Sequence, residues 1–134
     1  MDTVTYPDAR VQSFLAEHFE LTLVNVREPN DDSRELLRTV KPQWAPLFLA
    51  RDARGTELRR WFGWLAPEEF VAELTLVVGL RELLRQRFDE ALARFREGGT
   101  AEALWWAGAA AYKTGGLDAL RGAWDELTRR FPIY

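Results

Sequence analysis

The 134-residue chain contains no cysteine, one histidine and two serines, and each shortage excludes a class of chemistry. Without cysteine it can neither form a disulfide nor supply a thiolate nucleophile. His18 has no further ligands at a suitable spacing, so we expect no metal site. Ser13 and Ser33 belong to no recognisable serine–histidine–acid arrangement. We therefore predict no catalytic residue, metal or cofactor in this chain, and leave open whether it derives from an enzyme.

The charge balance and the apolar runs exclude further classes. The net charge is −3 with a pI near 5.3, so the basic excess of a nucleic-acid surface is missing. The apolar run over residues 70–78 is short and contains Glu73, so it cannot span a bilayer. The N-terminus also lacks the pattern of a signal peptide. We expect a cytoplasmic protein with neither a membrane nor a nucleic acid as partner, and a hydrophobic fraction of 47% predicts a packed core.

Hydrophobic periodicity predicts an α/β arrangement for the first part of the chain. The expected order is α-β-α-β-β-α: a helix from Pro7, a strand over residues 21–26, a helix after Ser33, strands over residues 47–50 and 57–62, and a helix from Pro67. A helix between the first two strands implies a parallel pair in one sheet. A hairpin turn at residues 52–55 makes the third strand antiparallel, with Gly55 free to take a positive φ.

The rest of the chain reads as helical. We expect three helices over residues 80–96, 101–114 and 117–130. Glycine pairs at residues 98–99 and 115–116 separate them, because glycine ends helices readily. With a boundary near residues 78–80, the predicted domains are 1–78 and 79–134.

The first part resembles bacterial thioredoxin-like proteins. After a Cys-x-x-Cys motif, such families carry the pattern M-x-x-x-T-[FY]-x-D-x-x-V-x-x-[FL]-[LI]-x-x-x-F. The matching positions are Met1, Thr5, Tyr6, Asp8, Val11, Phe14, Leu15 and Phe19. Further along, Val24, Val26, Arg27 and Glu28 look like the family's next strand end, and Gly63 like the glycine after its last strand. Pro46 resembles the family's cis-proline. The resemblance implies an incomplete thioredoxin-like domain.

The chain departs from that family at its start. The family's first strand and its two cysteines would precede Met1. Either the chain begins at an internal methionine of a longer reading frame, which we slightly favour, or the gene is naturally shortened. The first explanation implies a fragment of a thiol–disulfide oxidoreductase. The second implies a redox-inactive protein that acts in protein–protein interaction.

A missing central strand has a physical consequence. The family's first strand lies between the strands that resemble residues 21–26 and 47–50. Unpaired buried backbone groups cost about 1–3 kcal/mol each. We therefore expect either that the two strands close up and pair, or that a second chain fills the gap, since exposed edges invite pairing. A homodimer with a protein partner surface is the expected state.

The helical part resembles one and a half tetratricopeptide-type repeats. Residues 87–95 look like the second helix of one repeat. The next repeat's glycine, turn, packing positions and terminal proline are matched by Gly108, Gly115, Leu117, Leu120, Trp124, Leu127 and Pro132. Free arrays need three or more repeats, so we expect this segment to pack on the α/β part or on a partner.

Tryptophans supply the candidate binding residues. We predict a partner groove around Trp44, Ala45, Pro46 and Trp64. Two plainer explanations stay open: Pro46 only shapes its turn, and Trp44 fills space left by the missing strand. The acidic group of Glu28, Asp31 and Asp32 lacks the spacing of a calcium loop, so we expect it to cap a helix. Trp105 and Trp106 point about 100° apart on a helix, so one is expected to face the core.

Overall fold

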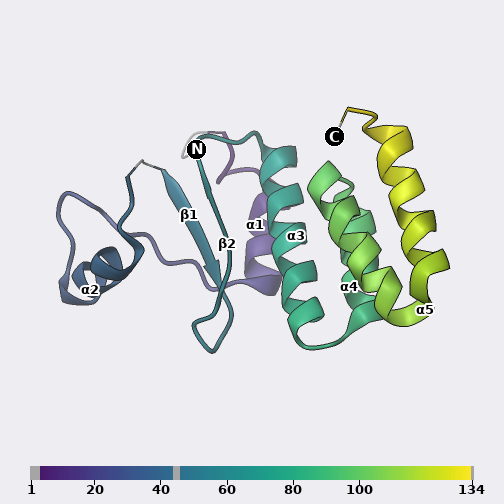
Figure 1. Cartoon of the computed structure of the whole chain (residues 1–134). Helices are drawn as coiled ribbons and strands as arrows, with labels where there is room; N and C mark the ends of the chain where they lie inside the picture. Colours follow the sequence, from purple (N-terminus) through teal and green to yellow (C-terminus); the bar gives the residue numbers. More distant parts are fainter. Residues whose placement is uncertain (1–3, 44–45, 134) are drawn as a thin grey trace.

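The computed structural model describes residues 4–43 and 46–133. Those residues form helices and one small sheet, in the order α1 (Ala9–His18), α2 (Asp31–Val40), β1 (Leu47–Arg51), β2 (Glu57–Phe62), α3 (Pro67–Leu84), α4 (Phe88–Gly98) and α5 (Ala101–Arg130). Figure 1 shows a main body made of α1, the β-hairpin and α3 to α5, with α2 to one side. The chain is therefore mixed, with long helices and a two-stranded sheet.

The helices predicted near Pro7, Ser33 and Pro67 are confirmed, although α2 begins at Asp31 rather than after Ser33, and their starts have local causes. The Asp8 carboxylate accepts hydrogen bonds from the backbone N–H groups of Arg10 and Val11 at the start of α1. Asn30 caps α2 by accepting from the N–H of Ser33 at 2.8 Å. Such caps satisfy N–H groups that have no partner inside the helix. α3 begins at Pro67, as predicted, where a missing N–H costs nothing.

The predicted hairpin is also confirmed. β1 and β2 pair antiparallel, with Phe48 opposite Trp61. Gly55 in the turn takes φ +85°, and Gly63 directly after β2 takes φ +93°. Both angles lie in the left-handed region that glycine enters without a steric cost. The turn chemistry read from residues 52–55 thus fixes where the chain reverses.

Two hydrophobic cores meet along α3. The first, which we call the hairpin core, joins α1, the sheet and the start of α3 around buried Val11, Phe70 and Leu74. The second, the helical core, joins the rest of α3 with α4 and α5 around residues that include Leu76 and Phe95. Because the two cores lie on different sides of α3, this helix is apolar nearly all round rather than on one stripe.

α5 bends back on itself. Gly116 has φ +73° and ψ −157°, which is not helical. The halves before and after it pack together, since the indole Nε1 of Trp124 donates to the carbonyl of Trp105 at 3.2 Å. The predicted break at residues 115–116 and the flanking helices are therefore confirmed. None of the described helices is long and apolar enough to cross a membrane.

The strand predicted over residues 21–26 is wrong. These residues form no strand, and the sheet pairs β1 only with β2. The run has the composition of a buried strand, but strand geometry is completed only by a hydrogen-bonded neighbour. No described segment offers one to it. The expected parallel pair with residues 47–50 is absent for the same reason.

The single helix predicted over residues 80–96 is also wrong. α3 ends at Leu84 and α4 starts at Phe88, with Gln86 between them at φ +61°. The apolar spacing continues across this turn because both helices pack into the helical core, so periodicity alone hides the break. Instead of three helices after residue 79, the structure has the end of α3, then α4, then the two halves of α5. α3 also runs unbroken through the boundary expected at residue 78.

Candidate interaction site

The site begins at the free edge of β1. Gly63 N–H donates to the Pro46 carbonyl at 3.0 Å. With the observed register, the pairs Phe48–Trp61 and Ala50–Arg59 then carry the bonds between the strands. Backbone groups alternate in direction along a strand. The N–H and C=O groups of Leu47, Leu49 and Arg51 therefore point away from β2, toward the outer edge of the sheet. In the described part of the chain, no strand pairs with that edge.

One face of the hairpin packs against α3, and the other, outer face is only partly covered. On the covered face, the Phe48 ring stacks on Trp61 at 5.3 Å and meets the edge of Phe70 from α3. The opposite face carries Leu47 and Leu49, paired across the strands with Phe62 and Arg60. Phe62 is 45% exposed. On this outer face Leu47 and Leu49 are half-buried and the Phe62 ring is exposed, and the face adjoins the free edge of β1.

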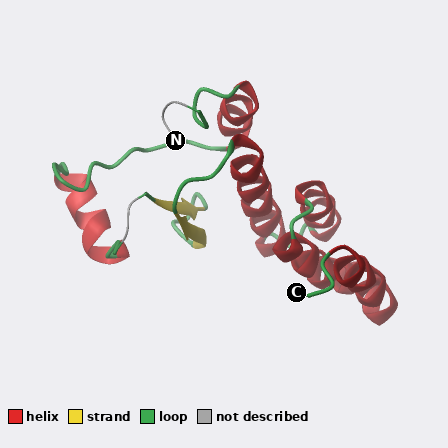
Figure 2. Cartoon of the chain, turned by 90° about the horizontal axis from the view of Figure 1, so that it is seen from above, coloured by secondary structure: helices red, strands yellow, loops and turns green. Residues whose placement is uncertain are grey.

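A long segment of the chain lies away from the body. We call residues 20–43 the arm; it comprises the extended run 21–26 and α2. None of its residues is buried. Figure 2 shows α2 well separated from the other helices, reached through long loops. A hydrogen bond from Arg60 Nη1 to the Val40 carbonyl, at 3.3 Å, joins the end of α2 to β2.

The arm nevertheless has the composition of buried structure. Leu21 and Val26 are each about half exposed, and Leu23 is 74% exposed. α2 is strongly amphipathic, and Leu36, Leu37 and Val40 form its apolar side without being buried. Exposed apolar surface of this extent is typical of an interaction site. The predicted inward face of α2 has the expected residues, but they are only half-buried.

The groove predicted from sequence is only partly visible. Trp44 and Ala45 lie outside the described residues, and so does the peptide bond that joins Ala45 to Pro46. Pro46 is exposed, and its carbonyl bond to Gly63 holds it at the end of the hairpin next to Trp64. The side chain of Trp64 is 57% exposed. The structure therefore brings two of the four predicted residues to one end of the free β1 edge.

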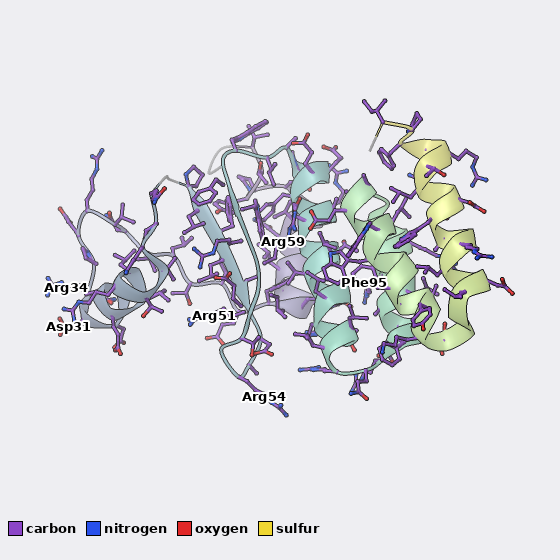
Figure 3. All side chains as sticks on the ribbon, in the orientation of Figure 1. Asp31, Arg34, Arg51, Arg54, Arg59 and Phe95 are labelled. Atoms are coloured by element: carbon purple, nitrogen blue, oxygen red, sulfur yellow. The ribbon has the colours of Figure 1, made fainter. Side chains whose placement is uncertain are left out.

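Sequence reasoning missed an ion-pair cluster that connects the two cores. Arg59 on β2 bonds Glu73 of α3, with 2.5 Å between Nε and Oε2, and Glu102 of α5, with 2.7 Å between Nη1 and Oε1. Figure 3 shows Arg59 where β2 faces α3. Burial alone would lower the pKa of Arg59, but the two carboxylates raise it, so the guanidinium stays charged. No motif could reveal these contacts, because the three residues are far apart in the sequence.

A second buried charge lies in the helical part. Glu82 is only 5% exposed and bonds Arg81 and Arg87. Burial raises the pKa of Glu82, but the hydrogen bond and charge of Arg81, with smaller contributions from Glu90 and Arg87, together leave the pKa lowered. Together with the Arg59 cluster, this carboxylate is satisfied by neighbours in its own chain. Ion pairs within the chain therefore explain the buried charges of Arg59 and Glu82, and we assign no ligand to either.

The remaining candidates are structural. Among the described residues no group of three His, Asp or Glu side chains could hold a metal ion. His18 packs against the Phe14 ring at 4.6 Å. Asp31 and Asp32 lie in the first turn of α2, where carboxylates favour the helix dipole. The prediction for the tryptophan pair is confirmed: Trp106 packs on the helical core, and Trp105 stacks on Trp124 nearer the surface.

Comparison with known proteins adds no relative to this picture. No protein-family model, curated protein or solved structure matches the chain. The function therefore follows from the chemistry of three features: the free β1 edge, the outer hairpin face and the arm.

Proposed function

We propose that the chain is a redox-inactive, thioredoxin-like protein that acts in protein–protein interaction, and that it accepts an extended segment at the free edge of β1. One observation carries the proposal. No described strand pairs with the outer edge of the apolar strand β1, while the arm that would be expected to cover this edge holds no buried residue. The thioredoxin-like assignment rests on the sequence resemblance. The proposal includes a tetratricopeptide-like role for the packing of α4 and α5, and a cytoplasmic location.

Strand addition suits this edge physically. An added strand gains affinity from main-chain hydrogen bonds and specificity from the side chains that alternate along it. Leu47, Phe48, Leu49 and Ala50 carry no charge that would repel an apolar strand. Arg51 marks the charged end of β1, so the acceptor edge is short. The accepted segment should therefore be extended and apolar over about five residues, as ordinary strands are.

Amide hydrogen exchange measured by NMR tests the acceptor edge. In the dilute chain, the outward amides of Leu47, Leu49 and Arg51 should exchange quickly, while that of Phe48 is protected by β2. Adding a synthetic peptide with the sequence of residues 19–27 should slow the three outward amides. The same peptide carrying Leu23→Asp is the matched control and should leave their exchange unchanged. Slow exchange without any peptide at a concentration where light scattering shows a monomer, or no response to either peptide, contradicts the proposal.

A second candidate function is a fragment of a thiol–disulfide oxidoreductase. The free β1 edge favours it, because the family resemblance puts a strand from upstream of Met1 at this position. An insulin-reduction assay separates the two functions. The 134-residue chain should be inactive under both, since it has no thiol. A chain extended by the in-frame codons that precede Met1 should reduce insulin only if the second function is right.

A further inference from the structure

We infer that the segment accepted at the β1 edge is the arm of a second copy of this chain, so that two chains exchange residues 20–43 reciprocally. This inference rests on the proposed function, because it names the partner of the same edge.

The arm needs a cover that its own body does not give. Leu21, Leu23 and Val26 are exposed in the extended run, and α2 has no buried residue. Burying one leucine or valine side chain stabilises by about 1.5–3 kcal/mol relative to leaving it in water. An arm with this many apolar residues therefore has much to gain from a second surface.

The hairpin offers the matching surface on the same chain. Residues 21–26 carry no charge and have apolar side chains on both alternations, which is the pattern of a strand buried on both faces. They suit the uncharged free edge of β1. The half-buried apolar side of α2 (Leu36, Leu37 and Val40) suits the partly covered outer face formed by Leu47, Leu49 and Phe62. One arm thus supplies both a strand for the edge and a helix for the face.

A second copy of the chain would cover the arm and the hairpin of both partners. In a twofold dimer the same surface serves both partners, so each arm donated is matched by an arm received. Figure 2 shows α2 lying apart from the hairpin of its own chain, which is the geometry from which an element can be exchanged. Both open surfaces disappear in the exchanged dimer, with no additional protein required.

Cross-linking between differently tagged copies tests the exchange. The chain has no native cysteine, so each introduced thiol is unique. One copy carries Leu23→Cys and the other Leu49→Cys; Leu21→Cys and Asn25→Cys replace Leu23→Cys in parallel to cover the register. Because a disulfide needs Cα atoms about 4.4–6.8 Å apart, we expect a heterodimeric disulfide for one of these pairs. Leu84→Cys, at an exposed position at the end of α3, is the matched control and should not cross-link to Leu49→Cys.

Light scattering of the unlinked protein gives an independent readout. The chain should be a dimer, and Leu23→Asp should weaken its dimerisation by roughly 100-fold or more, since an unpaired charge would enter the inserted strand. Leu23 is 74% exposed in the monomer, so the variant should keep the helical circular dichroism of the wild type. Leu84→Asp should remain a dimer.

Three outcomes would overturn the exchange, and each bears separately on the proposed function. A Leu49→Cys to Leu49→Cys cross-link alone means that two β1 edges pair, so the edge accepts a strand but the arm is not the donor. A monomer whose β1 amides respond to the peptide of residues 19–27 leaves the function intact and removes the second copy. If a chain that carries both Leu23→Cys and Leu49→Cys stays a monomer and forms the disulfide internally, the arm closes on its own body and both proposals fail.

Discussion

The ring of Phe95 lies where a side chain on Gly79 would have to be: an ideal Cβ at position 79 would come within 2.5 Å of its Cε1 atom. Phe95 is fully buried in the helical core, between α3, α4 and α5 (Figure 3). Glycine at position 79 therefore sets how closely α3 and α4 pack. Because α3 also belongs to the hairpin core, this contact affects how both cores are held together.

Gly79→Ala should destabilise the protein although alanine is the better helix former. Overpacking a filled core costs about 1–3 kcal/mol, and the propensity gain of about 1 kcal/mol offsets only part of it. Gly122→Ala is the matched control, because no atom lies within 4 Å of its ideal Cβ. It should stabilise by about 0.5–1 kcal/mol. Urea denaturation of the two variants measures both effects, and equal shifts would show that Phe95 moves aside freely.

Arg59→Met should lower the free energy of unfolding by roughly 1–3 kcal/mol, because it leaves Glu73 half-buried without its cation. Arg60→Met, which loses the exposed pair with Glu57 and an exposed hydrogen bond to the Val40 carbonyl, should change it by less than about 1 kcal/mol. Thermal and urea denaturation provide the comparison. If the changes in free energy of unfolding from Arg59→Met and Glu73→Gln simply add in the double variant, the two side chains are not coupled and this explanation is wrong.

Thr5→Val should cost about 1–3 kcal/mol, because it leaves the Leu65 carbonyl without its donor at almost unchanged side-chain volume. The Thr5 hydroxyl is fully buried and donates to that carbonyl at 2.6 Å. This bond ties the segment before α1 to the segment before α3. Thr22→Val, at an exposed position in the arm, is the control and should leave the free energy of unfolding of the monomer unchanged within about 0.5 kcal/mol.

The lowered pKa of Glu82 predicts an acid-sensitive contribution to stability. Its folded value lies below the ordinary 4.5, so ionised Glu82 stabilises the fold above that pH. The contribution is lost as the pH falls through the folded pKa, because the unfolded chain then binds the proton more readily. Urea midpoints measured from pH 7 downward should fall below about pH 4.5 more steeply for the wild type than for Glu82→Gln. Parallel curves would show that Glu82 is not involved; Glu97→Gln, at a more exposed pair, is the control.

Local signals predicted the elements whose cause lies within a few residues. Asp8 and Asn30 start helices by accepting N–H bonds from the next turn, and Gly55 allows the hairpin to reverse. These interactions join neighbours in the sequence, so their residue types and spacing indicate them directly. The break at Gln86 escaped prediction, because a non-glycine residue takes the positive φ there and the apolar spacing continues past it.

The candidate site was predicted less completely, for a related reason. The composition of residues 21–26 indicates a strand that is buried on both faces, but a strand exists only with a partner, and none of the described segments provides it. Pro46 and Trp64 were expected together, and the bond between Pro46 and Gly63 brings them to one end of the hairpin. The free edge of β1 and the exposed ring of Phe62 could not be predicted, because no residue type indicates whether a strand has a neighbour on both sides.

By itself, the sequence determined the chemistry that this chain lacks, most of its helix starts and its hairpin, because composition, caps and turns act over short distances. Only the tertiary structure decided that α3 belongs to two cores, that Arg59 joins them, and that the arm lies uncovered. Those features depend on contacts between residues far apart in the chain, where burial and pairing are settled by what packs nearby.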